Sequence, residues 1–436
     1  MADVPSIVQS STQPLPQPVR NFGKERYISY DWMQREWQTV WSKTWQVAAP
    51  LSDLLEAGDF VVYEIGAESL LLTCDKDGDP RAFYNVCQHR GVRLVDEPCG
   101  KRDSFRCPYH SWRYNPEGEM TYAPASDHFQ HGLPEDRVNL EEVRCETALG
   151  LVWVCLDSAA PPLAEFLRDM LPLMQHYQFE AMTLMQDQTV LVNCNWKAVV
   201  DNFGELYHVH YLHPQHRSFV DCSNARSDLY AGGHTRVWVP GATTDAQFSQ
   251  PDSPPELLEM QLSALGLDAN DFVGRVEEIQ PAIRAAKRKL AAGPMPHFSN
   301  FSDEELTDVM QTNVFPNMVC TYQPEMMWLM RVRPHATDPN QSYLDKFSFE
   351  MLTEDAAQPK PQQRPEHESF TYEDVIAGRH SMTPTIDQDL SLLRHAQQGM
   401  HSEGFAGVWL HETECRVAHF HQYLDQCIGH KEAFDR

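Results

Sequence analysis

The chain has 436 residues, 42% of them hydrophobic, which is enough for two or three domains with buried cores. Its formal net charge of −27 disfavours a nucleic-acid or anionic-membrane partner, because both carry charge of the same sign. No apolar run reaches the roughly 18 residues of a membrane span, and the start of the sequence does not resemble a signal peptide, so we expect a cytoplasmic protein. The eleven scattered cysteines suggest free thiols and a metal site rather than a disulfide framework.

The first part of the chain predicts a helix followed by short strands. Residues 27–45 read as a helix in which Trp37, Trp41 and Trp45 recur at i, i+4 and i+8 and form one apolar face. From about 60 to 157, runs of β-branched and aromatic residues alternate with turn signals. This pattern predicts a small all-β domain.

From about residue 161 onward the pattern mixes helices and strands. Apart from a Pro/Gln-rich linker at 358–366, the expected segments are helices at 201–216, 283–290, 387–400 and 412–427, and strands around 313–334 and 343–352. We therefore expect three parts: a tail and packing helix at 1–45, the β domain at 46–160 and a mixed domain at 161–436.

Two short loops in the β domain each offer one cysteine and one histidine. They read Cys87-x-His89 and, after seventeen further residues, Cys107-x-x-His110. Two thiolates and two imidazoles could hold a tetrahedral zinc ion. A Rieske [2Fe–2S] centre instead binds one iron with two cysteines and the other with two histidines, one of each kind from each loop. The stretches CQHRG and CPYHSWRY, followed by Gly118, resemble the Rieske family, which implies such a cluster on these four residues.

A second group of possible ligands lies in the stretch 201-DNFGELYHVHYLHPQH-216, which holds four histidines within nine residues. Non-haem Fe(II) oxygenases bind iron with two histidines and one carboxylate, and leave the opposite positions for O₂ and substrate. Spacing alone selects no pair, because a helix or a broken helix could present His208 with His213 or His210 with His213.

The longer stretch NCNWKAVVDNFGELYHVHYLHP resembles the iron-binding region of Rieske oxygenases. The resemblance implies that His208 and His213 bind iron, and that His210 and His216 lie at the surface or behind the ligands. It also implies a carboxylate from the closing helix, where the family has an acid eight residues before Gln-x-Gly. In TIDQDLSLLRHAQQGM that acid is Asp389.

Asp387 is the alternative carboxylate ligand, although it could instead cap the closing helix. Glu205, three residues before His208, has a different implied role. In the family an acid here joins the iron histidine to a cluster histidine of a neighbouring subunit, which implies a path from His110 of one chain through Glu205 of the next. The alternative is a solvent-facing helix acid. Asn202 stands with Glu205 among the candidate catalytic residues.

The resemblance covers about residues 37–424 and implies an α+β fold. An all-β Rieske domain would precede a helix-grip catalytic domain with a curved antiparallel sheet. The implied function is the terminal oxygenase alpha subunit, which activates O₂ at a mononuclear Fe(II) and hydroxylates or oxidatively dealkylates an aromatic or other small organic substrate, as in aromatic hydrocarbon catabolism. Many ring-hydroxylating members have Asp where this chain has Glu205, and a Glu at this position resembles the branch that oxidises quaternary ammonium compounds. The alternative is therefore monooxygenation of a choline-, betaine- or carnitine-like compound. A homotrimer, with or without a β subunit, is also implied.

No dinucleotide-binding fingerprint is present, so we expect NAD(P)H to be oxidised by a separate reductase. Around the cluster loops, basic residues outnumber acidic ones by six to three, unlike the acidic whole. The six are Arg90, Arg93, Lys101, Arg102, Arg106 and Arg113. We expect an acidic ferredoxin or flavin reductase to dock near these loops, with Lys101 and Arg102 contributing.

The residues expected to line a substrate pocket are Phe203 and side chains of the strand section, Cys320, Tyr322, Met327 and Trp328. An aromatic and thioether surface suits an apolar ring. Aromatic rings also hold trimethylammonium groups by cation–π contact, so the lining does not decide between the two substrate classes.

Overall fold

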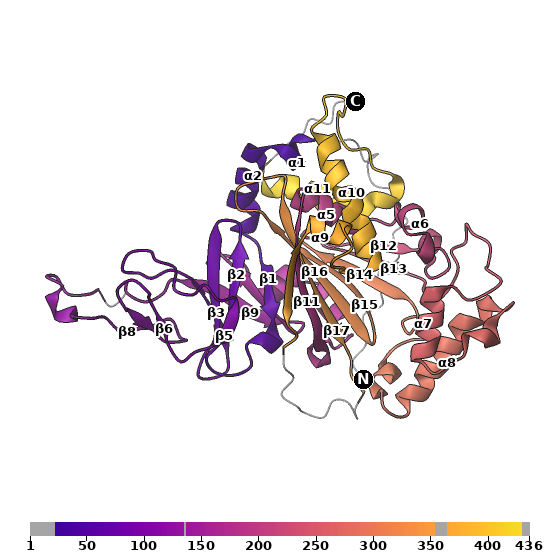
Figure 1. The fold of residues 1–436 in the computed structure, drawn as a ribbon, viewed down its shortest axis with the longest axis horizontal. Helices are drawn as coiled ribbons and strands as arrows, with labels where there is room; N and C mark the ends of the chain where they lie inside the picture. The colour runs from indigo at the N-terminus through magenta and orange to yellow at the C-terminus, as the bar shows by residue number, and fades with distance from the viewer. Residues whose placement is uncertain (1–21, 135–136, 354–363, 430–436) are drawn as a thin grey trace.

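The computed structural model describes residues 22–134, 137–353 and 364–429. Most of the expected tail and of the Pro/Gln-rich linker lies outside the described residues. Two large β-sheets organise the described chain, and a small three-stranded sheet lies at one end (Figure 1). None of the helices in these ranges has the length and apolar character needed to cross a bilayer.

The N-terminal helix is shorter and more broken than the sequence predicts. It consists of α1 (Glu25–Ile28), α2 (Tyr30–Glu36) and a π-helical turn (Trp37–Trp41). Ser29 interrupts it because this residue is extended and its side chain accepts a hydrogen bond from the backbone N–H of Trp32, which starts α2. Trp45 lies beyond the helix, and its indole N–H donates to the carbonyl of Pro161 over 2.8 Å.

The first large sheet contains seven strands in the order β1-β10-β9-β4-β3-β2-β5, all antiparallel. They are β1 (Gln46–Pro50), β2 (Asp59–Ile65), β3 (Glu68–Cys74), β4 (Pro80–Tyr84), β5 (Cys99–Lys101), β9 (Glu142–Ala148) and β10 (Leu151–Cys155). The small sheet contains β6 (Phe105–Arg106), β7 (Arg113–Tyr114) and β8 (Met120–Tyr122). The cysteine–histidine loops follow β4 and join β6 to β7, so the two sheets hold them.

The second large sheet contains eight strands in the order β12-β13-β14-β15-β16-β17-β11-β18. They are β11 (Thr183–Val192), β12 (Arg226–Leu229), β13 (Thr235–Val239), β14 (Val309–Val314), β15 (Met318–Gln323), β16 (Met326–Pro334), β17 (Ser342–Glu350) and β18 (His367–Thr371). All neighbours are antiparallel except the edge strand β18, which runs parallel to β11. The sheet is curled, as expected, but the parallel edge strand was not predicted.

Side-chain alternation gives the second sheet two different faces. On one, here called the helix face, residues such as Val319 and Met330 pack against α5 (Trp196–Phe203) and α10 (Pro384–Met400). On the other, here called the opposite face, residues such as Tyr322 and Met327 pack against α3 (Leu163–Leu167), α4 (Met170–Gln175) and strand β10. The helix face also carries α11 (Cys415–Cys427).

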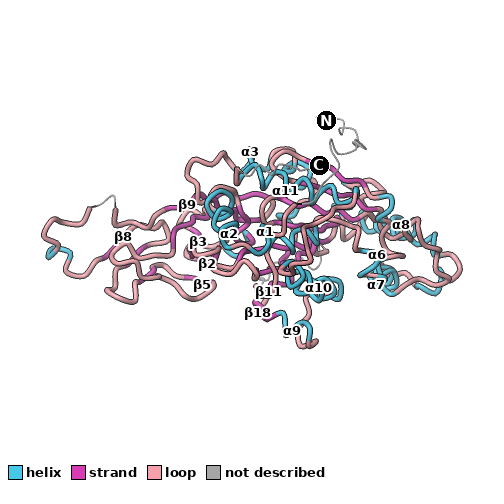
Figure 2. Tube along the Cα trace, turned by 90° about the horizontal axis from the view of Figure 1, so that it is seen from above, coloured by secondary structure: helices cyan, strands magenta, loops and turns pink. Residues whose placement is uncertain are grey.

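The remaining α-helices lie at the edges of the second large sheet. They are α6 (Val209–Leu212), α7 (Glu256–Ala264), α8 (Ile279–Ala291) and α9 (Tyr372–Ile376). Two perpendicular views place the small three-stranded sheet at one end of the molecule and α6, α7 and α8 toward the other (Figures 1 and 2). The two candidate metal sites therefore lie far apart within one chain.

Candidate metal centres

Tight turns present the cysteines and histidines of the first centre. The backbone N–H of Cys87 donates to the carbonyl of Val92, and the N–H of Cys107 to the carbonyl of Trp112, both over 2.8 Å. Gly91 has a φ of 71° in the first loop, a conformation that glycine adopts at little cost. Each loop thus folds back on itself around one Cys-His pair.

The four side chains of the first centre fit a Rieske cluster. Cys87 and Cys107 are buried, and the rings of His89 and His110 lie 4.5 Å apart between centroids. The Nδ1 atoms of both histidines are buried without a hydrogen-bond partner among the described residues. Such nitrogens are costly unless they bind something, and a metal ligand is the use that explains both. Burial raises the pKa of the Cys87 thiol, and the hydrogen-bonded Cys107 beside it adds to this shift, so iron would have to stabilise the thiolates.

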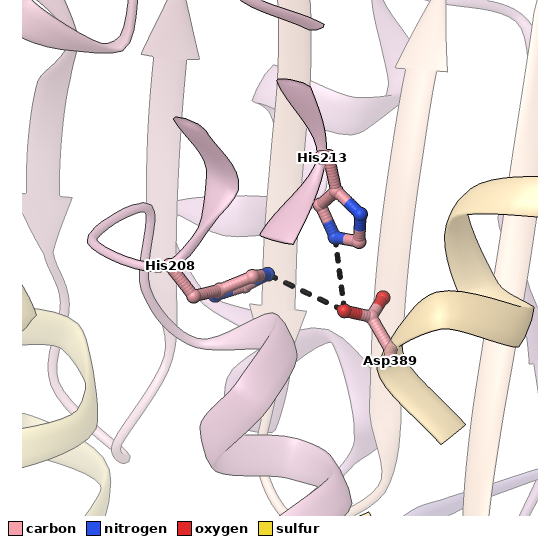
Figure 3. A group of neighbouring side chains, drawn as sticks. All are labelled: His208, His213 and Asp389. Atoms are coloured by element: carbon pink, nitrogen blue, oxygen red, sulfur yellow. Dashed lines mark hydrogen bonds and ion pairs between the residues drawn. The ribbon is translucent and has the colours of Figure 1, made fainter. Parts of the chain in front are cut away.

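The second centre brings together His208, His213 and Asp389 (Figure 3). Their ligand atoms all lie within 4.8 Å of one another. Oδ1 of Asp389 is 3.0 Å from Nε2 of His213 and 3.4 Å from Nε2 of His208. Two imidazole nitrogens and one carboxylate, largely buried and converging on one point, are the donor set that suits iron(II).

A break in the expected helix at 201–216 makes this convergence possible. Helix α5 ends at Phe203, and α6 is a single turn flanked by His208 at its start and His213 at its end. Pro214 follows directly and cannot continue the helix. The two histidines therefore stand at the two ends of one turn, and both face α10, which carries Asp389.

Two further side chains orient the histidines. Nδ1–H of His208 donates to Oε1 of Glu205, and Nδ1–H of His213 donates to Oε1 of Gln388 over 2.6 Å. Each ring then keeps a proton on Nδ1 and presents Nε2 toward Asp389. A metal ion bound at this point requires the tautomer that leaves Nε2 free to bind it. Gln388 was missed in the sequence, although it directly precedes the predicted ligand Asp389.

Two of the ligand candidates, His208 and Asp389, have shifted pKa values. Burial disfavours the protonated form of His208, but hydrogen bonds to Asp389 and Glu205 outweigh it and raise the pKa to about 9. Burial alone would raise the pKa of Asp389, but its hydrogen bonds with the imidazoles of His208 and His213 outweigh burial and lower this pKa. A metal ion binding here must displace the proton on His208, so metal affinity should rise with pH.

The other two histidines of the stretch have partners of their own. His210 is only 6% exposed, and its Nε2–H donates to Oδ2 of Asp245 over 2.7 Å. It is therefore a buried residue and not a surface one. His216 lies 2.9 Å, through Nε2, from the hydroxyl of Thr385. Asp387 accepts a hydrogen bond from the backbone N–H of Met382 over 3.0 Å, and it is not part of the metal-binding group found among the described residues.

The candidate catalytic and pocket residues are divided between the two faces of the sheet. Nδ2 of Asn202, on α5, is buried without a partner in the described chain, and Phe203 packs into the core on the helix face. Trp328 also lies on the helix face, since it neighbours Met330 at two residues' spacing. Tyr322 and Met327 lie on the opposite face, so the structure does not bring them to the metal site. Cys320 shares their face.

Two family models match separate parts of the chain. Residues 44–142 match the Rieske [2Fe-2S] domain model, and residues 179–430 match the model of the ring hydroxylating alpha subunit (catalytic domain). Together these domains imply a Rieske cluster and a mononuclear iron. The donor sets of the two centres agree with that pair of cofactors.

Curated relatives match over part of the chain. The large oxygenase component of the naphthalene 1,2-dioxygenase system of Pseudomonas putida is 33% identical over 187 residues, 41% of each chain. The carnitine monooxygenase oxygenase subunit of Escherichia coli (strain K12) is 32% identical over 194 residues, 43% of this chain and 50% of the relative. The alignments thus span half or less of these relatives' lengths.

Solved structures match over nearly the whole chain. A quaternary ammonium Rieske monooxygenase superposes with a TM-score of 0.68 at 18% identity, covering 93% of this chain and 95% of the other. At this identity the likeness establishes the fold, and the catalytic-domain model, which spans more than half of the sequence, establishes the family. The chain belongs to the family of ring hydroxylating alpha subunits, with a Rieske [2Fe-2S] domain ahead of the catalytic domain.

Proposed function

We propose that this chain is the terminal oxygenase component of a multicomponent Rieske oxygenase, hydroxylating a small organic substrate. The observation that carries the proposal is the convergence of His208, His213 and Asp389 on the helix face, in a chain that also has a matched Rieske domain. Monooxygenation of a quaternary ammonium compound is supported by Glu205 and by the carnitine monooxygenase subunit among the relatives, but the naphthalene dioxygenase relatives support a ring substrate equally well. The ring of Trp328 already has Nζ of Lys346 at 5.5 Å, which does not favour a second cation there.

The residues of the second centre have distinct proposed roles. When bound, an iron(II) ion supplies the binding and reduction of O₂, and the cluster supplies electrons one at a time. His208, His213 and Asp389 would hold the iron, while Glu205 and Gln388 fix the two imidazole tautomers. Nδ2 of Asn202, which has no partner in the described part of the chain, would donate to a polar group of the substrate or to a water molecule.

The separation of the centres supports electron transfer between subunits. The small sheet beside the cluster loops lies at one end of the chain in both views, and α6 lies toward the other end (Figures 1 and 2). Near Glu205 the surface carries exposed aromatic rings: Tyr207 is 51%, Tyr211 71% and Trp409 77% exposed. Exposed apolar groups of this kind mark interaction surfaces. We propose that a neighbouring chain of a homotrimer places its cluster loops against this patch.

We propose that an acidic reductase or ferredoxin docks at cations beside the cluster loops that have no carboxylate partner among the described residues. Lys101 pairs with Glu56, and Arg102 lies 2.7 Å from Glu97, so these two cations are locally neutralised. Arg90 and Arg106 are exposed beside the cluster loops and have no carboxylate partner among the described residues. We therefore place the docking site of an acidic partner at Arg90 and Arg106.

A His213→Ala variant of the full chain tests the oxygenase proposal. It should keep the red-brown colour and reduced EPR signal of the Rieske cluster, lose the mononuclear iron, and lose O₂ uptake. Uptake is measured with a surrogate reductase and a panel of aromatic acids, N-methyl compounds and quaternary amines. Asp387→Asn is the matched control and should keep the iron. Loss of iron in the control but not in His213→Ala would contradict the assignment.

A further inference from the structure

A buried arginine lies close to the proposed iron site without a matching acid. Arg416, in the first turn of α11, is 2% exposed. Its Nη1–H donates to Oε1 of Gln311 over 2.9 Å, whereas Nη2 is buried without any partner in the described chain. It forms no ion pair with a carboxylate among these residues, unlike the buried Arg331 and the largely buried Arg333, which both pair with Asp345. Burying a guanidinium is costly unless its charge is compensated.

The position of Arg416 places this unmet charge on the helix face. Its neighbour Val417 packs against Gly204, so closely that a Cβ added to this glycine would lie 3.1 Å from a methyl group of Val417. Gly204 follows the last residue of α5 and precedes Glu205. The start of α11 therefore lies beside the end of α5 and close to Glu205. Gln311, which receives the Arg416 hydrogen bond, is the cross-strand partner of Val237.

An apolar patch adjoins the guanidinium. Val237 belongs to a cluster that includes Leu206 and Phe219, and Leu206 lies in the turn between Glu205 and His208. Further hydrogen-bonding groups on the same face are unused: Thr235 and Asn313 are cross-strand partners next to Val237 and Gln311, and both have a buried side-chain oxygen without a partner in the described chain. The patch therefore has buried hydrogen-bond donors and acceptors that no group of the described chain satisfies.

Arg416 remains charged in this setting. Burial lowers its pKa to about 10, while the nearby Cys415, Glu205 and Cys222 oppose the shift, so the guanidinium is protonated at neutral pH. A planar guanidinium with one free edge matches the geometry of a carboxylate, to which it can donate hydrogen bonds that are stronger than those between neutral groups.

We propose that the substrate of the iron site carries a carboxylate that binds the free edge of Arg416, with its apolar body against Leu206, Phe219 and Val237. The inference rests on the proposed oxygenase function and narrows it to organic acids. It makes Arg416 a specificity-determining residue rather than a structural one, because no carboxylate of the described residues forms an ion pair with it or reaches its free edge.

Matched substrate pairs test the inference in the full holoenzyme. Benzoate is compared with benzamide, and 2-naphthoate with 2-naphthamide, by substrate-dependent O₂ uptake. The wild type should prefer each acid. Arg416→Gln should raise KM for the acids by about 10- to 100-fold, the loss expected for a hydrogen bond to a charged group, with a much smaller effect on kcat. Equal KM values for acid and amide in the wild type, or an acid preference that survives in Arg416→Gln, would overturn the inference.

Arg236→Gln is the matched control for these assays. Arg236 is a largely buried arginine on β13, the strand next to the one that carries Gln311. Its side chain lies on the opposite face of the sheet, where it pairs with Asp228 at 2.8 Å. Its loss should lower stability and leave the acid preference intact. If Arg236→Gln abolished that preference as Arg416→Gln does, the effect would be a general consequence of losing a buried arginine.

Thermal unfolding separates this inference from the proposed function. The acids should raise the Tm of the wild type and not that of Arg416→Gln, because ligand binding stabilises the folded state whether or not turnover occurs. Failure of O₂ uptake with every compound, together with this rise in Tm, would sink the oxygenase proposal and leave the carboxylate site standing. No rise in Tm with either acid would sink the carboxylate site.

Discussion

His213 is held between two consecutive residues of helix α10. Its Nδ1–H donates to Gln388 over 2.6 Å, and its Nε2 lies 3.0 Å from Asp389. Consecutive helical residues point about 100° apart, so the two side chains reach the ring from different sides. Gln388 also accepts a hydrogen bond from Gln215 over 2.7 Å, which ties it to the same segment as His213. The helix thus orients one candidate ligand while supplying another.

Replacing Gln388 by Leu should weaken iron binding by about 10- to 100-fold, because the ring of His213 loses the partner that fixes its tautomer. The release of mononuclear iron to a chelator, measured at increasing chelator concentration, gives this value. Gln398→Leu changes an exposed residue of the same helix and should have no effect. Equal iron affinity in Gln388→Leu and the wild type would show that Gln388 does not orient the ligand.

Glu205→Gln should keep both metal centres and lose turnover by about 100-fold or more. The amide oxygen of Gln can still accept the Nδ1–H of His208, so the iron stays bound. Its NH₂ group cannot accept a second imidazole N–H from a neighbouring subunit. Metal content, the Rieske EPR signal and O₂ uptake are measured together, with the exposed Glu412→Gln as control. Loss of iron would instead make Glu205 a ligand.

The sequence was most informative where ligands are close together in the chain. The Cys-x-His and Cys-x-x-His spacings defined the first centre, because each loop forms its geometry locally. Long-range partners were not predictable from spacing. The partner of the buried His210 is Asp245, 35 residues further along the chain, and the partner of His213 is Gln388, 175 residues further along.

The substrate-lining residues show a second limit. Because side chains alternate along a strand, the sequence predicts that Tyr322 lies on one face of the sheet and its neighbours Thr321 and Gln323 on the other. It does not predict which of the two faces packs against the helices. That choice is made by the packing of α5 and α10 on one side and β10 on the other. Arg416 was overlooked for a related reason, since its burial follows from how α11 packs at the end of α5.

Asp345 should contribute strongly to stability. Its carboxylate is buried and accepts hydrogen bonds from Arg331 over 2.7 Å and from Arg333 over 2.6 Å. These arginines also donate to the carbonyls of Ala48 and Glu64 and so tie the first large sheet to the second. Asp345→Asn should lower the free energy of unfolding by about 3–5 kcal/mol, measured by urea denaturation, because it leaves two buried guanidinium groups without a counter-charge.

The pH dependence of this effect has a defined sign. Burial would raise the pKa of Asp345, but Arg331 and Arg333 outweigh it and hold the pKa well below its usual range. The stabilisation is therefore complete above the usual aspartate pKa of about 3.9 and is lost as the pH falls below it. The difference between wild type and Asp345→Asn should shrink in acid. Glu142→Gln, which removes an exposed pair with Arg81, should cost less at neutral pH, and an equal cost would contradict the argument.

Charge reversal at Arg90 or Arg106 should slow reduction of the cluster by an acidic ferredoxin about tenfold at low salt, with a smaller effect at high salt. Both cations are exposed and unpaired with acids among the described residues. Lys101→Glu is the comparison, because Lys101 already pairs with Glu56 and Asp59. Stopped-flow reduction rates at several ionic strengths decide between the sites. A larger effect of Lys101→Glu would move the docking surface to that side of the domain.

Mixed oligomers test the transfer of electrons between subunits most directly. One chain carries Cys107→Ser and lacks an intact cluster, and the other carries Asp389→Ala and lacks the mononuclear iron. Each should be inactive alone. If the cluster of one subunit serves the iron of the next through Glu205, co-assembly of the two chains should restore part of the O₂ uptake and product formation. No recovery from co-assembled chains that each retain their remaining metal centre would contradict the account.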